Sequence, residues 1–396
     1  GFVENLTLNE TDSITVYDCF LGVPPTGDVR NDGSQFGLTA YLASHLQIGS
    51  DLAETGNVIS GNSSYGILMD SCSTVAIQHN LLGLANNGSQ QLFNGLASIA
   101  VRSGSDSVMI SHNQIACDKA GIRFQETHHS LIAHNLINTD STFTQREIDG
   151  SGIVLTARSR DNLIMENFIG YCQIAITVTD EGTINNRISR NNISENDFGI
   201  WLVDGGNHEI AAPVIHEANS MRISGSASPG QVIELFADAN NQGREYITSV
   251  TSSADGEFEL LQNLMISFPN VTATATDSEG NTSGFSAPVQ IDEVSVKTEN
   301  QTIANRFTMS SNYPNPFNPE TIINYSVPHI TDVKFTIYNV AGQKVHTLLS
   351  TRKQPGEYSI QWDGKDGSGN NVTSGIYFCR MEASSFTHLV KMTLIR

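Results

Sequence analysis

The sequence has little positive charge and no long hydrophobic run. Its 396 residues include 21 Lys and Arg against 41 Asp and Glu, which gives a formal net charge of −20 at pH 7. An acidic chain repels the phosphates of nucleic acids and anionic lipids, so we expect no nucleic-acid partner. Because no apolar stretch approaches the length of a membrane-spanning helix, we also expect no membrane span.

Cysteine is scarce as well. The five cysteines lie far apart and include no Cys-x-x-Cys pair, a spacing that favours neither a zinc site nor a disulfide framework. We interpret them as buried free thiols. The chain starts at Gly1 instead of an initiator methionine, and we expect that an N-terminal segment has been removed. Its length predicts two or three domains.

A repeat fills the first half of the chain. The pattern Ile-x-x-Asn-x-Ile/Leu recurs, and Asn57 before Ile59 extends the series by one position. A Gly-Ile or similar pair lies between these positions, which predicts two short strands per repeat. Such a repeat is typical of a parallel β-helix, with Ile and Leu inside and the Asn side chains stacked from coil to coil. The predicted ladder consists of Asn57, Asn80, Asn113, Asn135, Asn167 and Asn191.

Every second repeat is longer than its neighbours by about ten residues, and we expect the extra residues to form loops on one flank. They fall in three polar segments, 22–37, 83–95 and 138–152. Segments such as 57–62 (NVISGN) and 80–83 (NLLG) resemble the right-handed β-helix repeat proteins that are common among secreted bacterial polypeptides. The resemblance implies the fold but leaves the function open, since that family includes polysaccharide lyases and proteins without known activity.

A third kind of pattern occupies residues 208–292. Strand-like alternation at 231–237 and 271–276, separated by Asp-Gly and Gly-Asn turns, predicts an immunoglobulin-like β-sandwich. The stretch 273–286 resembles the closing strands of bacterial Ig-like spacer domains. A polar linker, 293–308, is expected to follow.

The C-terminal segment 309–396 carries a proline-rich motif near its start. The prolines prevent a helix and favour an extended edge segment, after which alternating strands predict a small sandwich. The motif comprises Tyr313, Pro314, Asn315, Pro316, Phe317, Asn318 and Pro319. With the later segments 362–367 (WDGKDG), 374–378 (SGIYF) and 391–396 (KMTLIR), it resembles the C-terminal sorting domain of the type IX secretion system. The resemblance implies a Bacteroidetes-like bacterium, contact with the secretion machinery, and export to the outer-membrane surface or the medium.

The residues that precede the ladder asparagines form a second column. It includes His79, His112, His134, Glu166 and Arg190, with neighbours about 4.8 Å apart at the usual strand spacing. Three histidines in a row suit metal binding or proton transfer. A solvent-facing column tolerates any polar residue, however, and the change from His to Glu to Arg favours an incidental role. We therefore predict no catalytic, cofactor or metal site. Calcium suits the acidic charge, but the acidic residues are scattered and define no site for it.

An outward column on the Gly-Ile strands carries several apolar residues. A row of such residues on an exposed face indicates a contact surface for a partner or a second copy. The open first coil, around 2–8, offers a further contact because its strand edge is unpaired. The candidate contact residues are Phe2, Val3, Leu6, Leu68, Val154 and Trp201. Trp201, Tyr65 and Tyr171 also suit stacking on a surface glycan.

Together these patterns predict an all-β chain with a right-handed parallel β-helix at 1–207, an Ig-like sandwich at 208–292, a linker at 293–308 and a sorting-type sandwich at 309–396. The predicted function is that of a secreted cell-surface structural or adhesive protein, with head-to-tail self-association into a homopolymer. The alternatives are a carbohydrate-active enzyme, either a polysaccharide lyase or a glycoside hydrolase, and a non-catalytic glycan-binding module. Convergent carboxylates in one outward column would favour the enzyme, and we find none in the sequence.

Overall fold

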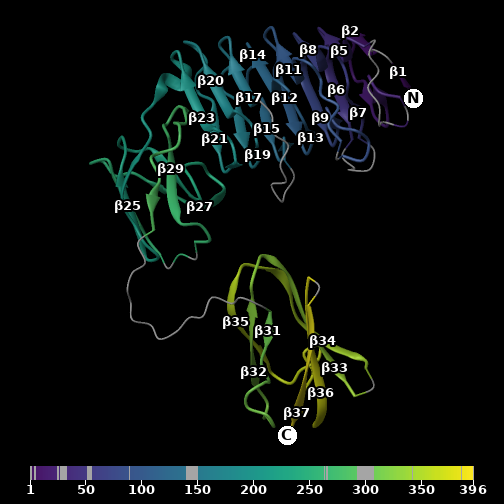
Figure 1. Ribbon diagram of the computed structural model, residues 1–396, viewed down its shortest axis with the longest axis vertical. Helices are drawn as coiled ribbons and strands as arrows, with labels where there is room; N and C mark the ends of the chain where they lie inside the picture. The colour runs from purple at the N-terminus through teal and green to yellow at the C-terminus, as the bar shows by residue number, and fades with distance from the viewer. Residues whose placement is uncertain are drawn as a thin grey trace. The chain divides into compact units, whose positions relative to one another are not determined.

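The computed structural model describes residues 2–3, 6–24, 26, 34–50, 56–88, 90–139, 150–262, 264, 266–291, 307–340, 342–384 and 386–395. The chain divides into two compact units, Gly1–Val294 and Ser295–Arg396. In the described residues the regular structure is β-strand, apart from a short 3-10 turn at Gly206–Glu209. The predicted all-β class, a parallel β-helix followed by two sandwiches, is confirmed (Figure 1).

The β-helix is built from three parallel sheets, and each full coil contributes one strand to each sheet. Sheet A contains β1 (Phe2–Val3), β4 (Phe20–Leu21), β7 (Val58–Ile59), β10 (Leu81–Leu82), β13 (Gln114–Ile115), β16 (Leu136–Ile137), β19 (Phe168–Gly170) and β22 (Asn192–Ser194). Sheet B contains β2 (Leu6–Asn9), β5 (Phe36–Tyr41), β8 (Tyr65–Asp70), β11 (Ala97–Arg102), β14 (Ala120–Gln125), β17 (Ser151–Thr156), β20 (Ile174–Thr179) and β23 (Phe198–Val203). Sheet C contains β3 (Thr15–Val16), β6 (Ser44–Gly49), β9 (Ser73–Gln78), β12 (Asp106–Ser111), β15 (Leu131–Ala133), β18 (Leu163–Met165) and β21 (Arg187–Ser189).

The expectation of two strands per repeat is wrong, because each coil also has a sheet A strand. From β7 to β22 these strands directly follow the ladder asparagines, and all strands of sheet A are two or three residues long. A strand of two or three residues is too short to show the alternation of apolar and polar residues that predicts a strand, so the sequence pattern did not indicate it.

Each coil places the same positions inside. In sheet B, Ile67, Ile99 and Ile122 are paired in register and fully buried. The polar segments at 22–37, 83–95 and 138–152 all connect a sheet A strand to the following sheet B strand, and thus lie at one corner of the β-helix. Their residues 25, 27–33, 89 and 140–149 lie outside the described part of the chain.

An antiparallel sandwich follows the last coil in the same unit. One sheet is formed by β24 (Val214–Ala218), β25 (Arg222–Ser226) and β28 (Glu257–Leu261). The other is formed by β27 (Glu245–Thr251), β26 (Val232–Asp238), β29 (Asn270–Thr276) and β30 (Val289–Gln290). Their facing apolar residues form a separate core that includes Ile233, Leu235 and Phe258.

This sandwich closes the end of the β-helix through hydrogen bonds at the last coil. The Glu234 carboxylate accepts from the Arg190 backbone N–H at 2.8 Å and from the Ser189 hydroxyl. The backbone N–H of Ile193 in sheet A donates to the Gly243 carbonyl at 2.9 Å. The donors of an exposed sheet edge are satisfied in this way by a second domain.

A second set of contacts lies at the other side of the last coil. The backbone N–H of Ile188 donates to the Thr282 hydroxyl at 2.9 Å, and that of Asn185 donates to the Asn281 side chain at 2.6 Å. Phe285 packs against the apolar core of the β-helix. The β-helix and the first sandwich therefore share polar and apolar contacts.

The second unit is a separate sandwich. Its first sheet contains β31 (Thr308–Met309), β32 (Thr321–Val327) and β35 (Gly356–Trp362). Its second sheet has the order β34 (Lys344–Lys353), β33 (Thr331–Asn339), β36 (Gly375–Ala383) and β37 (Phe386–Leu394). Trp362, Phe317 and Phe335 are among its largest buried side chains. Most of the predicted linker 293–308 lies outside the described residues.

Candidate functional site

The corner between sheets C and A holds the six asparagines predicted to stack. In each of the five steps, the side-chain amide N donates to the Oδ1 atom of the next asparagine, at 2.8–3.0 Å. The same Oδ1 atom also accepts the backbone N–H of the preceding asparagine, as in the 2.9 Å bond from Asn80 to Asn113. All six side chains are buried. Because these polar groups satisfy one another inside the coil, this column is a structural element and leaves no group free for a ligand.

Similar but shorter columns occur at the other two corners, and the repeat pattern of the sequence did not predict them. At the corner between sheets A and B, Asn62 donates to Asn94 at 2.9 Å, and Asn138 donates to the sulfurs of Cys117 and Cys172, each at 3.1 Å. Burial raises the pKa of the Cys172 thiol to about 12, which keeps it protonated and unreactive. These columns mix residue types, so no single-residue repeat reveals them.

The column of three histidines projects from the outside of the corner between sheets C and A. The rings of His79 and His112 stack with centroids 5.0 Å apart and planes 21° apart, and those of His112 and His134 lie 4.9 Å apart. The backbone φ angles of the three histidines are positive, between 55° and 57°. Glu166 and Arg190, at the same position of later coils, also have positive φ angles. The left-handed conformation therefore belongs to the corner of the coil and does not mark the histidines as special.

The histidine column continues into charged residues toward the first sandwich. His134 Nε2 lies 3.5 Å from a Glu166 carboxylate oxygen, and Glu166 lies 4.0 Å from the Arg190 guanidinium. That guanidinium lies over the ring of Tyr246 in the sandwich, 5.3 Å from its centroid. Partial burial and the neighbouring His134 and His79 lower the pKa of His112. His112 is therefore neutral at pH 7.

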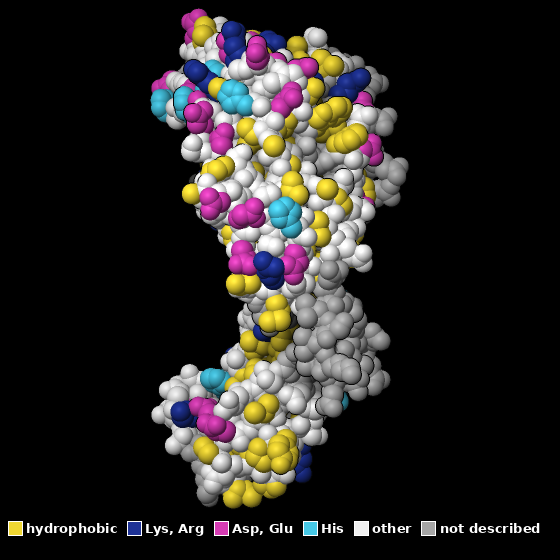
Figure 2. All heavy atoms as spheres, turned by 90° about the vertical axis from the view of Figure 1, so that its left-hand side faces the viewer, with side chains coloured by type: hydrophobic (Ala, Val, Ile, Leu, Met, Phe, Trp, Pro, Cys, Tyr) yellow, Lys and Arg dark blue, Asp and Glu magenta, His cyan; other side chains and the backbone are white. Residues whose placement is uncertain are grey.

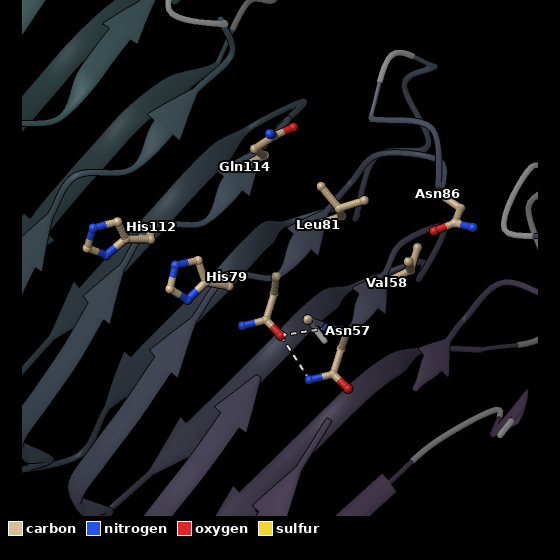
Figure 3. A pocket seen from close by; sticks show the side chains of 9 residues that line it. Asn57, Val58, His79, Leu81, Asn86, His112 and Gln114 are labelled. Carbon is tan, nitrogen blue, oxygen red and sulfur yellow. Dashed lines mark hydrogen bonds between the residues drawn. The ribbon is translucent and has the colours of Figure 1, made fainter. Parts of the chain in front are cut away.

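A shallow pocket of about 260 Å³ opens beside the first two histidines. Figure 3 shows the rings of His79 and His112 side by side, with Leu81, Val58 and Gln114 on neighbouring strands. Because the two rings are nearly parallel, their nitrogen lone pairs do not converge on one point. In the part of the chain that the structure describes, no group of three His, Cys, Asp or Glu side chains is arranged to hold a metal ion.

Another histidine, at the corner between sheets B and C, contacts two aspartates. His129 Nδ1 lies 2.6 Å from Asp106, and its Nε2 lies 3.8 Å from Asp161. The hydrogen bond from His129 is the main cause of the lowered pKa of Asp106. These side chains are largely exposed, so the contacts make a small contribution to stability. Figure 2 shows acidic side chains spread over the visible face and interleaved with histidine and basic side chains.

The predicted apolar contact column is only partly exposed. Leu68 is 2% exposed, because it belongs to a small apolar cluster with Ala97, Ala100 and Ala120 on the outer surface of sheet B. The expectation that Leu68 presents a contact surface is therefore wrong. Val154 is half-buried against the same cluster.

Trp201 is the member of this column that reaches solvent. It is 43% exposed and pairs with Phe198, which is also exposed, at a centroid distance of 5.3 Å. Leu6 is half-buried, and Tyr65 and Tyr171, the other predicted stacking residues, are half-buried as well. The side chains of Phe2 and Val3 lie outside the described part of the structure.

The proline-rich motif of the second unit is a series of bends instead of the expected extended edge segment, and isolated bridges at Tyr313 and Phe317 join it to the two sheets. Phe317 is buried against Trp362 with ring centroids 5.5 Å apart, and its backbone N–H donates to the Thr393 carbonyl at 2.9 Å. The Asn315 side chain accepts the Thr393 backbone N–H, also at 2.9 Å. Tyr313, by contrast, is 82% exposed. The motif thus combines an aromatic anchor in the core with an exposed tyrosine.

Two families match parts of this chain. The family described as right handed beta helix region matches residues 52–212, and the FlgD Ig-like domain family matches residues 323–386. The chain therefore contains a right-handed β-helix region and, in its second unit, an FlgD Ig-like domain. Comparison with curated proteins found no match.

Solved structures align with the chain at low similarity. Dimeric latent PorU from Porphyromonas gingivalis is 16% identical over 49% of this chain and 21% of its own, with a TM-score of 0.20. PorZ, a surface component of the type-IX secretion system of the same organism, is 14% identical over 46% of this chain and 22% of its own, with a TM-score of 0.19. A tetra-tandem repeat from the extending region of a large adhesion protein is 18% identical over 49% of this chain and 52% of its own, with a TM-score of 0.18. The chain spans about a fifth of the length of PorU and of PorZ.

Among the described residues, no helix has the length and apolar character needed to cross a bilayer.

Proposed function

We propose that this chain is an exported cell-surface protein with a structural or adhesive role. The observation that carries the proposal is the asparagine ladder together with the hydrogen bonds from the last coil to Glu234 and Gln242 of the first sandwich. Repeat proteins of this kind are held by contacts between neighbouring coils, and a closed last coil protects the edge from unwanted pairing. A β-helix held together in this way suits a protein that presents a contact surface outside the cell.

The route to the surface is proposed from the second unit. The segment from Tyr313 to Pro319 and the strands after it resemble the sorting domain of type IX secretion, and we assign them the role of an export signal. The secretion machinery is then a partner of the exposed part of this unit, where Tyr313 reaches solvent. The resulting location is the outer-membrane surface or the medium.

No catalytic or cofactor role is included in this proposal. The outward His, Glu and Arg side chains of the corner column are engaged with one another. A glycosidase of the usual kind needs two carboxylates that face each other across a substrate. Glycan binding without catalysis is the second candidate function, because the exposed Phe198 and Trp201 rings offer a stacking surface on a rigid strand.

The test is expression of the full chain in a bacterium with an active type IX system and in an otherwise identical strain without it. We expect surface protease to digest the protein in intact cells of the first strain, and an intracellular protected form in the second. Equal exposure in both strains would contradict the proposed route. A polysaccharide panel incubated with the purified chain checks the role: release of new reducing ends or unsaturated products would contradict the structural function and support an enzyme.

A further inference from the structure

Charge is divided unevenly between the two units. Residues 1–294 contain 34 Asp and Glu and 11 Lys and Arg, a formal charge of −23, whereas residues 295–396 contain 7 and 10, a charge of +3. The acidic character of the chain therefore belongs entirely to the unit with the β-helix. The second unit is weakly basic, and its basic side chains are not evenly distributed.

The outer face of the four-stranded sheet in the second unit carries five of these ten cations. Residues facing the core alternate with exposed ones along β33, β36 and β37. The strand register places five cations on the outer face, against two anions, Asp332 and Glu382. The five cations are Lys334, Lys344, Arg352, Arg380 and Lys391. We call this surface the basic face.

Apolar side chains lie among the cations of the basic face. Phe378 is directly opposite Tyr338 on one side and Lys391 on the other, and Leu389, which is 51% exposed, is opposite Arg380. The Arg380 guanidinium is fixed over the Tyr338 ring, 4.9 Å from its centroid, and donates to the Tyr338 hydroxyl at 2.6 Å. Exposed apolar groups beside ordered cations are typical of a protein interface.

We propose that the basic face of the second unit docks on the acidic first unit of another copy of this chain. Charge complementarity supports this occupant, since the chain itself supplies a unit with a charge of −23. A contact between two different surfaces of the same chain is heterologous, and repetition of it joins copies head to tail. The proposal rests on the structural role given above and names the surface through which that role is carried out.

Changing the salt concentration distinguishes the attraction between charged groups at the proposed contact from the repulsion between two negatively charged chains. Two copies of the chain repel each other over long distances because each has a formal net charge of −20. At about 0.15 M salt the screening length is about 8 Å, so distant like charges are largely screened whereas groups in contact still attract. At about 1 M it is about 3 Å, and contact ion pairs weaken too. Sedimentation velocity of the full chain should thus reveal oligomers at the lower concentration and fewer of them at the higher.

Matched variants locate the contact. Lys334→Glu with Lys391→Glu reverses two cations of the basic face, and we expect self-association to weaken by about tenfold or more. The control, Lys353→Glu with Lys365→Glu, makes the same change in net charge away from that face, because Lys353 lies over Tyr358 of the other sheet and Lys365 lies in the connection between β35 and β36. The control should associate like the unmodified chain. Thermal unfolding of both variants verifies that each is folded.

Zero-length carbodiimide cross-linking identifies the acidic partner surface. A mixture of ordinary and ¹⁵N-labelled full chain distinguishes links between copies from links within one copy. We expect mixed-label links from Lys334 or Lys391 to carboxylates within residues 1–294. Links that are all within one copy, or links from Lys353 and Lys365 at equal yield, would overturn the proposal.

Other outcomes separate this contact from the function on which it rests. A chain that stays monomeric at both salt concentrations up to about 0.1 mM, a concentration at which micromolar interfaces are saturated, refutes the docking. So does binding to anionic vesicles that depends on Lys334 and Lys391 while the protein stays monomeric, because it assigns the face to a lipid surface. Surface exposure that depends on type IX secretion would still support the proposed function in those cases. Conversely, self-association with polysaccharide cleavage would leave the contact in place and refute the structural role.

Discussion

The Gln242 side chain stands beside Asn196 in the place that an asparagine of a further coil would occupy. Its Oε1 atom accepts the Asn196 backbone N–H at 3.2 Å and the Asn196 side-chain N–H at 2.9 Å. Asn113 accepts the same two donors from Asn80, at 2.9 and 3.0 Å. A residue of the first sandwich thus continues the bonding pattern of the β-helix. Its removal leaves the buried Asn196 backbone N–H without this acceptor, while the Asn196 side-chain N–H group keeps the Ile169 and Ser194 carbonyls.

Gln242→Ala is therefore expected to destabilise the first unit. Leaving a buried donor unsatisfied costs about 1–3 kcal/mol, and equilibrium unfolding in urea measures the loss. The control is Asn240→Ala in the same loop, whose exposed side chain makes no hydrogen bond in the described structure. It should change stability by less than about 0.5 kcal/mol. Equal effects of the two substitutions would show that Gln242 is not needed to close the coil.

Asn135→Leu interrupts the ladder at its centre. Asn113 then loses the acceptor for its backbone N–H and one of the acceptors for its side-chain N–H group, both at 3.0 Å from Asn135. We expect a loss of about 1–3 kcal/mol in the free energy of unfolding, with faster hydrogen exchange at the Asn113 amide. Asn86→Leu, at an exposed position of the same β-helix, is the matched control. Unchanged exchange at Asn113 would mean that the backbone pairing alone holds the corner.

The histidine column is predicted to be incidental to folding and binding. Replacement of His79, His112 and His134 by alanine should change stability at pH 7.5 only within the range of surface substitutions, about 0.5 kcal/mol at each position. Metal analysis after dialysis against zinc or nickel tests the binding half of this prediction. Stoichiometric metal in the unmodified chain that disappears in the triple variant would contradict it.

The lowered pKa of His112 predicts a specific pH dependence. Because the folded chain binds this proton less well than the unfolded chain, folded stability falls as the pH drops below the unfolded value of about 6.5. Above that pH both states are neutral at this position and the effect vanishes. His79 and His134 face the ring, with Glu166 beyond them. Unfolding curves between about pH 5 and 8 should therefore slope less for His112→Gln than for the unmodified chain, and equal slopes would contradict the assignment.

The sequence was sufficient to predict the ladder positions because one residue type recurs at one corner of almost every coil. The column at the corner between sheets A and B was not predictable in the same way, since Asn138 bonds to cysteines and Asn62 has a single asparagine neighbour. The short strands of sheet A were missed because two residues carry no period.

Exposure was harder to predict than register. The position of Leu68 in its strand was correctly assigned to the outside of sheet B, but its environment depends on alanines from later coils. Such contacts join residues far apart in the sequence, and strand alternation alone does not report them. The closing role of Glu234 was likewise hidden, because it lies in a strand of another domain.

The asparagine ladder also makes the length of the β-helix adjustable. Every ladder asparagine bonds to an equivalent residue in the adjoining coil, so a whole coil can be added or removed and each remaining asparagine still meets an asparagine. The first sandwich would contact the same last coil in each case. A designed series of such chains would work as a molecular ruler graduated in single coils, each step about 4.8 Å long.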